Sequence, residues 1–198
     1  MIEMYILTCP ARKESLALTL AALKETDWGE EPTIMLDRIE GGSPTQQMIN
    51  NSMRLLERGR DGSAEYILFI EDDVIFNRHL RHNLENWFPL KYGVCLVGTL
   101  YEGANLPATC RNFREVHPGA IGGSQAIVIK RDWIPSILAQ WNKYPNFTLQ
   151  DLRIYRSLLG TQQKLFCHSP NLVQHRPEVS TWGGGKHTSP TFDLNWRA

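Results

Sequence analysis

Three consecutive acidic residues, Glu71, Asp72 and Asp73, form the segment best suited to chemistry. They follow residues 66–70 (YILFI), which are apolar at every position and therefore predict a buried strand. In an open α/β sheet, ligands bind beyond the carboxyl ends of the strands. Adjacent carboxylates at such a place favour a divalent cation such as Mg²⁺ or Mn²⁺. The alternative is a solvated acidic turn in which an aspartate caps the next element.

Other residues are suited to binding an anion or a close-lying substrate. Arg12 offers a planar guanidinium with five donors, which suits phosphate, although a surface arginine is an equal alternative. The pair Gly122-Gly123 permits a close approach of backbone to substrate, or simply a turn before a strand. In the tail, Lys186 follows three glycines whose N–H groups could approach a diphosphate. That tail does not have the spacing of a P-loop, and the alternative is a frayed terminus.

The elements that must position these residues alternate between short apolar strands and amphipathic helices, which predicts an α/β fold. Strands are expected at residues 4–7, 33–36, 66–70, 94–98, 126–129 and around 165–166. Helices are expected at residues 15–25, 44–58, 80–87, 134–141 and 148–159.

Local signals set the expected helix ends. Ser43 precedes Pro44 and has capping-box spacing to Gln46, which predicts a helix start. Gly59 is expected to end that helix in a left-handed conformation. Asp132 is expected to cap the helix that follows it. Thr148 and Asp151 also have capping-box spacing.

Length and composition limit the class of protein. The chain has 198 residues, 21 basic and 21 acidic side chains, so its formal net charge is zero. One domain is expected at residues 1–182, followed by a Gly/Ser/Pro-rich tail at 183–198 that could act as a lid. The charge balance argues against a generally basic nucleic-acid coat. We expect no membrane span, because no apolar run approaches the roughly 20 residues that one requires.

The cysteines Cys9, Cys95, Cys110 and Cys167 are scattered and contain no Cys-x-x-Cys pair. This spacing argues against a zinc knuckle or a dense disulfide framework. We therefore expect reduced thiols and a cytoplasmic location.

The stretch YILFIEDDVIF resembles the strand and acidic motif of the GT-A-fold glycosyltransferases, whose Rossmann-like domain has a mostly parallel central sheet flanked by helices. This resemblance implies a single GT-A domain. It also implies that Asp73 binds the metal of a sugar nucleotide, that Asp72 faces the ribose or the sugar, and that Glu71 supports them.

Further segments agree with this family in order and type. The segment YILTCPAR is similar to the family's first strand and nucleotide-binding loop, which implies donor contacts at Thr8, Cys9, Pro10 and Arg12. Asp37, after the second expected strand, is similar to an acid that contacts base or ribose, although it could equally be a turn residue.

The second half of the chain continues the resemblance. Residues 120–131 resemble the strand that follows a Gly-rich turn, which implies donor-sugar contacts at Ser124 and Gln125. Asp151 fits the catalytic base of inverting members, which deprotonates the acceptor hydroxyl, while the alternative is a helix-capping role. The segment HSPNLVQH resembles the end of the core in bacterial lipopolysaccharide-type and branching N-acetylglucosaminyltransferases. By that resemblance His175 completes the metal shell, and His168 packs in the core.

The resulting hypothesis is an inverting, metal-dependent glycosyltransferase that uses a nucleotide-sugar donor, preferably linked to UDP, with Mn²⁺ or Mg²⁺. The acceptor hydroxyl would belong to a glycan or lipopolysaccharide, or to a modified base on DNA, because the acceptor loop is locally basic. Acceptor residues are expected among Tyr101, Arg111, Arg114, His117 and Trp182. The alternatives are a nucleotidyltransferase, although the first loop lacks that class's glycines, and a non-catalytic sugar-nucleotide or glycan-binding module. The sequence leaves the oligomeric state open.

Overall fold

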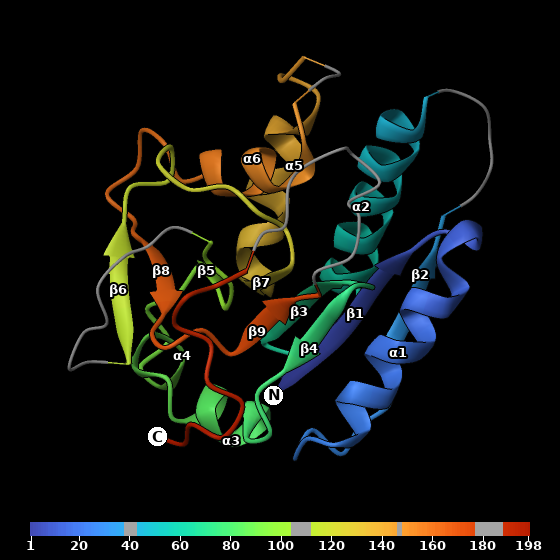
Figure 1. Ribbon diagram of the computed structural model, residues 1–198. Helices are drawn as coiled ribbons and strands as arrows, with labels where there is room; N and C mark the ends of the chain where they lie inside the picture. The colour runs from blue at the N-terminus through green and yellow to red at the C-terminus, as the bar shows by residue number, and fades with distance from the viewer. Residues whose placement is uncertain (38–42, 104–111, 146–147, 177–187) are drawn as a thin grey trace.

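The computed structural model describes residues 1–37, 43–103, 112–145, 148–176 and 188–198. These residues form a seven-stranded sheet, a two-stranded sheet and covering helices (Figure 1). The strands of the large sheet are β1 (Ile2–Thr8), β2 (Thr33–Leu36), β3 (Tyr66–Glu71), β5 (Val97–Thr99), β6 (Phe113–Val116), β7 (Ala126–Lys130) and β8 (Leu165–His168). The small sheet pairs β4 (Val74–Phe76) with β9 (Val173–His175).

The helices are α1 (Lys13–Lys24), α2 (Pro44–Arg60), α3 (Leu80–Glu85), α4 (Phe88–Lys91), α5 (Ile134–Trp141) and α6 (Gln150–Arg156). Two short 3₁₀ turns, η1 (Pro10–Arg12) and η2 (Arg131–Trp133), precede α1 and α5. No helix in the described part of the chain has the length and apolar character needed to cross a membrane.

The large sheet has the strand order β2-β1-β3-β7-β5-β8-β6. β2, β1 and β3 are parallel neighbours, and β5 is parallel to β8. β7 runs antiparallel to both β3 and β5, which gives β2, β1, β3, β5 and β8 one common direction. The edge strand β6 is antiparallel to β8. The predicted α/β fold with a mostly parallel central sheet is confirmed.

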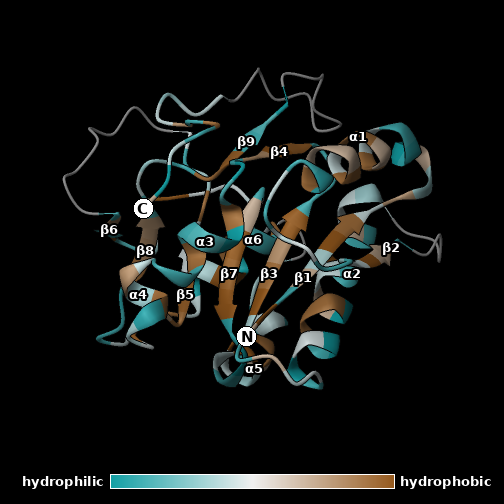
Figure 2. Ribbon diagram, turned by 90° about the horizontal axis from the view of Figure 1, so that it is seen from below, coloured by the Kyte–Doolittle hydropathy of each residue, from teal (hydrophilic) through white to brown (hydrophobic). Residues whose placement is uncertain are grey.

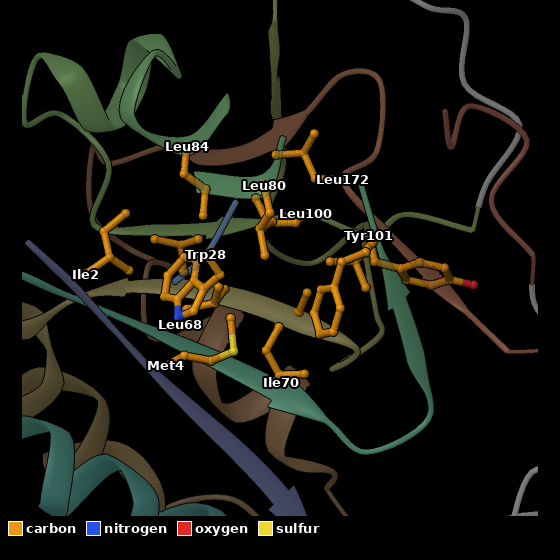
Figure 3. Close-up of a cluster of buried hydrophobic side chains, with 14 of the residues drawn as sticks. Ile2, Met4, Trp28, Leu68, Ile70, Leu80, Leu84, Leu100, Tyr101 and Leu172 are labelled. Atoms are coloured by element: carbon orange, nitrogen blue, oxygen red, sulfur yellow. The ribbon is translucent and has the colours of Figure 1, made fainter. Parts of the chain in front are cut away.

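The central strand β3 is buried on both faces, as its continuous apolar sequence predicts. Tyr66, Leu68 and Ile70 point to one side, where they join Trp28, Leu80 and Leu84 in a hydrophobic cluster (Figure 3). Ile67 and Phe69 point to the other side, where α2, α5 and α6 pack. In Figure 2 the central strands are hydrophobic, whereas the helices carry hydrophilic residues as well. Burial of each such side chain contributes about 1.5–3 kcal/mol.

The predicted start of α2 is confirmed, and its predicted end is wrong. Ser43 is the N-cap, and its hydroxyl accepts a hydrogen bond from the backbone N–H of Gln46 at 3.3 Å. The helix continues through Gly59 to Arg60. A Cβ at residue 59 would lie 2.9 Å from Cδ1 of Ile67, so this glycine allows α2 to approach β3 closely rather than ending the helix.

Other expected boundaries also differ. The helix expected at 80–87 begins at Leu80 as predicted but ends at Glu85, and the strand β4 before it was not expected. The strand expected at 94–98 begins only at Val97. Asp132 lies inside η2, and the N-cap of α5 is Trp133, so the predicted cap is wrong. The strands β6 and β9 were not expected, because each has only three or four residues and is defined by its pairing partner.

The described end of the chain, residues 188–198, packs against α3 and the segment before it. Nδ2 of Asn77 donates to the carbonyl oxygens of Asp193 at 2.7 Å and Trp196 at 2.9 Å. Nδ2 of Asn83 also donates to the Trp196 carbonyl, at 3.0 Å. The lid role of the tail at 183–198 stays a prediction, since residues 183–187 lie outside the described residues. Among the described cysteines, the thiols of Cys9, Cys95 and Cys167 are free.

His168 lies in the core between Trp87 and Trp196, as its predicted packing role requires. Burial lowers its pKa from 6.5 to about 4, although its hydrogen bond to the Pro170 carbonyl opposes that shift. Because the unfolded chain therefore binds this proton at higher pH than the folded chain, stability should fall as the pH decreases from 6.5 towards 4.

Between pH 7 and pH 5, the titration of His168 should lower the free energy of unfolding of the wild type by about 2 kcal/mol. In His168→Gln we expect this part of the pH dependence to be absent, because glutamine does not titrate. Urea unfolding at both pH values measures this difference, with the exposed His117→Gln as the control. An NMR titration of the wild-type histidines provides a direct check that needs no variant. A His168 pKa near 6.5, or an unchanged pH dependence in His168→Gln, would contradict the prediction.

Candidate active site

A cavity of about 620 Å³ lies beside the carboxyl ends of β1 and β3. Its lining includes residues from the end of each strand, Thr8 and Glu71, together with residues from the loop before β7 and the start of α6. The expected donor and metal residues that line it are Thr8, Cys9, Arg12, Asp37, Asp72, Asp73, Ser124, Gln125, Asp151 and His175. The sequence thus selected residues that the fold brings together from six separate segments.

Arg12 bridges the two aspartates of the acidic motif. Its Nε lies 2.6 Å from Oδ1 of Asp72, and its Nη2 lies 2.6 Å from Oδ2 of Asp73. The turn η1 begins with Pro10 and ends with Arg12 at the start of α1, which directs the guanidinium to the end of β3. Pro10 itself is not among the cavity-lining residues, and its fixed φ shapes this turn. Its donor contact stays a prediction.

Asp72 is held from several sides. The Thr8 hydroxyl donates to its Oδ2. The backbone carbonyl of Asp72 accepts hydrogen bonds from the hydroxyls of Ser15 at 2.9 Å and Thr19 at 2.7 Å, and from Arg176 at 3.1 Å. Burial raises the pKa of Asp72, and the bonds from Thr8 and Arg12 offset only part of that effect. The acidic turn is therefore fixed to the first turns of α1.

His175 reaches Asp73 because β9 pairs with β4 directly after the acidic motif. Val74 lies opposite His175 in this pairing, and His175 Nε2 lies 3.2 Å from Oδ2 of Asp73. Burial alone would raise the pKa of Asp73, but the hydrogen bond from His175 and the charge of Arg12 hold it below its usual value. The hydrogen bond to Asp73 raises the pKa of His175.

The chemistry of these side chains fits a divalent cation in part. Oδ1 of Asp73 and Nδ1 of His175 are buried and have no hydrogen-bond partner among the described residues. The described residues hold no cluster of three His, Cys, Asp or Glu side chains able to bind a metal. Two protein ligands are nevertheless common for Mg²⁺-type sites in which phosphate oxygens and waters complete the shell.

A second group of polar side chains lies at the other side of Glu71. The Ser124 hydroxyl donates to Oε1 of Glu71, and Nε2 of Gln150 donates to the Ser124 hydroxyl at 2.8 Å and to the same Glu71 oxygen at 3.3 Å. Burial and the charge of Asp73 raise the pKa of Glu71 to about 7. Glu71 therefore connects the acidic motif to the loop before β7 and to α6.

Asp151 does not form the predicted capping box with Thr148. The helix α6 begins at Gln150, its N-cap is Leu149, and no side chain caps it. Oδ2 of Asp151 instead accepts the backbone N–H of Gly123 at 2.6 Å. Gly123 has φ +114°, a conformation that favours glycine, and its carbonyl accepts the hydroxyl of Tyr155 at 2.7 Å. The carboxylate is thereby directed to the cavity rather than to its own helix.

The expected acceptor residues separate in the structure. Tyr101 lines the cavity, and His117 is exposed. Arg114 forms a largely buried ion pair with Glu102 at 2.9 Å, so its charge is offset. Arg111 and Trp182, as well as the donor candidate Lys186, lie outside the described residues.

Sequence reasoning missed two polar residues of this site. Gln150 precedes the candidate base directly and is 2% exposed, but a glutamine in a first helical turn gives no distinctive signal. Arg176 follows His175, and its Nη2 donates to the Ser15 carbonyl and hydroxyl at 2.7 Å. Its position next to the candidate metal ligand His175 is the one feature of the sequence that could have identified it as part of the site.

We expect Arg12→Met to lower the free energy of unfolding by about 3 kcal/mol, because two adjacent and nearly buried carboxylates lose the cation that they share. Urea unfolding at pH 7 measures the effect. The control is Arg60→Met, which removes an exposed guanidinium that pairs with Asp61 and should change stability far less. Equal effects of the two substitutions would show that Arg12 has no special role in the fold.

Comparison with known proteins adds evidence on the fold. No protein-family model and no curated protein sequence matches this chain. Among solved structures, a Drosophila β1,4-galactosyltransferase 7 in complex with manganese, UDP-Gal and xylobiose matches with a TM-score of 0.53 and 12% identity, over 98% of this chain and 77% of that one. A glycosyltransferase involved in glycosylation of the major capsid of PBCV-1 matches with a TM-score of 0.52 and 12% identity, over 85% and 82% of the two chains. The expected glycosyltransferase fold is therefore confirmed.

Proposed function

We propose that this protein is a metal-dependent glycosyltransferase that moves a sugar from a nucleoside diphosphate to an acceptor hydroxyl. One observation carries the proposal. Arg12, Asp72, Asp73 and His175 meet at the carboxyl ends of parallel strands, inside a cavity, in a fold shared with glycosyltransferases. The volume of about 620 Å³ lies within the range usual for small-ligand pockets.

The donor's nucleoside would lie near β1, β2 and α2. Leu7 and Met48 supply apolar surface there, while Thr8, Cys9 and Asp37 supply polar groups. Arg12 would bind the diphosphate, because it lines the cavity and its planar guanidinium suits phosphate geometry. Lys186 remains a candidate for the same diphosphate from the sequence alone.

Asp73 and His175 would hold the cation, Mn²⁺ or Mg²⁺, through the Asp73 carboxylate and His175 Nε2, which face each other in the structure. When bound there, the cation would offset the charge on the departing diphosphate. A mixed oxygen and imidazole donor pair suits Mn²⁺ better than Mg²⁺. The proposal therefore favours Mn²⁺.

Asp151 would act as the base. Its Oδ2 is held by the Gly123 N–H and the residue lines the cavity, so its carboxylate is placed to take a proton from a bound acceptor. The acceptor oxygen would form a bond to the anomeric carbon as the bond from that carbon to the diphosphate oxygen breaks. Asp151 takes the acceptor's proton, and attack opposite the leaving group inverts the anomeric centre.

The acceptor would approach from the side of Tyr101 and Glu102, which also line the cavity. We favour a glycan hydroxyl over a DNA base. The ion pair between Arg114 and Glu102 removes one positive charge from the loop that suggested DNA.

Thermal unfolding with UDP, GDP, CDP and TDP, each with and without Mn²⁺, tests the donor site. One nucleotide, expected to be UDP, should raise the melting temperature by about 5–11 °C at 100 times its dissociation constant, and only with Mn²⁺. Asp73→Asn should lose that increase, whereas the control Asp132→Asn should keep it. No shift with any nucleotide would overturn the proposal.

Asp151→Asn should reduce UDP release from the donor by about 10²–10⁴-fold, since an amide cannot take the acceptor's proton. Its affinity for UDP should change little, because the amide oxygen can still accept the Gly123 N–H. The rate of UDP release and a UDP titration measure the two effects separately. Turnover at the wild-type rate with UDP bound would remove Asp151 as the base, and UDP binding without turnover in the wild type would indicate a binding module.

A further inference from the structure

Two side chains of α6 hold the backbone of Gly123 from both sides. Oδ2 of Asp151 accepts the Gly123 N–H at 2.6 Å, and the hydroxyl of Tyr155 donates to the Gly123 carbonyl at 2.7 Å. Asp151 and Tyr155 stand at positions i and i+4 of this helix, so they lie one above the other on the same face. The helix therefore bonds to both peptide groups that flank the α-carbon of Gly123.

The backbone conformation of Gly123 depends on these two bonds. Its φ of +114° lies in a region that glycine adopts freely, and a glycine has many other conformations open to it. The N–H belongs to the peptide group before the α-carbon, and the carbonyl belongs to the group after it. The two bonds together restrict both φ and ψ. Tyr155 thus helps to fix the direction in which the Gly123 N–H points towards Asp151.

Tyr155 is itself held firmly and does not line the cavity. Its side chain is completely buried, in the same hydrophobic cluster as Val97 and Ile127. Burial raises the pKa of Tyr155 well above its ordinary value of 10, so the hydroxyl keeps its hydrogen and remains a donor. Because Tyr155 is not among the described residues that line the cavity, it can affect a bound ligand only through Gly123 and Asp151.

We infer that Tyr155 is a positioning residue for Asp151, the candidate base. By holding the Gly123 carbonyl, it directs the Gly123 N–H to one oxygen of the Asp151 carboxylate and fixes the orientation of that carboxylate. A base must lie within hydrogen-bond reach of the proton that it takes, and a displacement of about 1 Å can lower a rate about 100-fold. This inference rests on the proposed function, because it presumes that Asp151 takes a proton.

Tyr155→Phe tests the inference because it removes one hydroxyl and keeps the buried ring. The matched control is Tyr66→Phe, since Tyr66 is also buried but its hydroxyl has no hydrogen-bond partner among the described residues. Amide hydrogen exchange measured by NMR should show the Gly123 N–H exchanging about fivefold faster or more in Tyr155→Phe, and at the wild-type rate in Tyr66→Phe. An unchanged exchange rate in Tyr155→Phe would overturn the inference.

Kinetics test the effect on the reaction. UDP release is measured with Mn²⁺ and with water as the acceptor, from UDP-glucose, UDP-galactose and UDP-N-acetylglucosamine. On the donor that the wild type uses, Tyr155→Phe should lower the rate about 10–100-fold, while its affinity for UDP stays within about twofold of the wild type. If the wild type releases UDP from none of the three, the proposed function fails and this inference fails with it. If Tyr155→Phe keeps the wild-type rate, only the inference is overturned.

A double variant separates positioning of the base from a general structural role. In the Asp151→Asn background, Tyr155→Phe should cause no further loss of rate, because no base is left to position. Urea unfolding confirms that each variant is folded under the assay conditions. An equal relative loss in the wild-type and Asp151→Asn backgrounds would show that Tyr155 acts independently of Asp151 and would overturn the assignment.

Discussion

The carboxylates of Asp72 and Asp73 are adjacent in the chain, and both are almost completely buried where β3 ends. Two such charges repel each other and are poorly solvated, so the fold requires a cation at this point. Arg12 supplies it by contacting one oxygen of each carboxylate at 2.6 Å. The chain runs from β1 through η1 into α1, and this path places the Arg12 guanidinium beside the two carboxylates.

The elements around this ion pair hold it in one geometry. Ser15 and Thr19, in the first two turns of α1, donate hydrogen bonds from their hydroxyls to the backbone carbonyl of Asp72. The pairing of β4 with β9 places His175 beside Asp73. A site built on helices and strands in this way keeps its side chains in place before a ligand arrives, which favours both binding and catalysis.

Glu71 divides the cavity into two chemical environments. On one side of it Arg12 and His175 pair with the carboxylates of Asp72 and Asp73. On the other side Ser124 and Gln150 donate hydrogen bonds to Glu71. The positive φ of Gly123 makes this second environment, because it turns the backbone N–H towards Asp151.

Features that depend on neighbouring residues were predictable from the amino-acid sequence alone. The continuous apolar run of β3 predicted a buried strand and put the acidic motif at its end, and Ser43 predicted the start of α2. The resemblance of short motifs selected residues from six separate segments that all line the cavity. These signals are local, because strand periodicity and helix caps are set by residues a few positions apart.

Features that depend on residues far apart in the chain became visible only in the folded protein. Arg12 and Asp72 are sixty residues apart, and nothing local marks them as an ion pair. Gly59 reads as a helix stop, but it is needed where Ile67 packs against α2. Asp151 has the spacing of a cap, yet it bonds to Gly123 from another segment. The strands β4 and β9 are too short to carry a pattern and exist through their mutual hydrogen bonds.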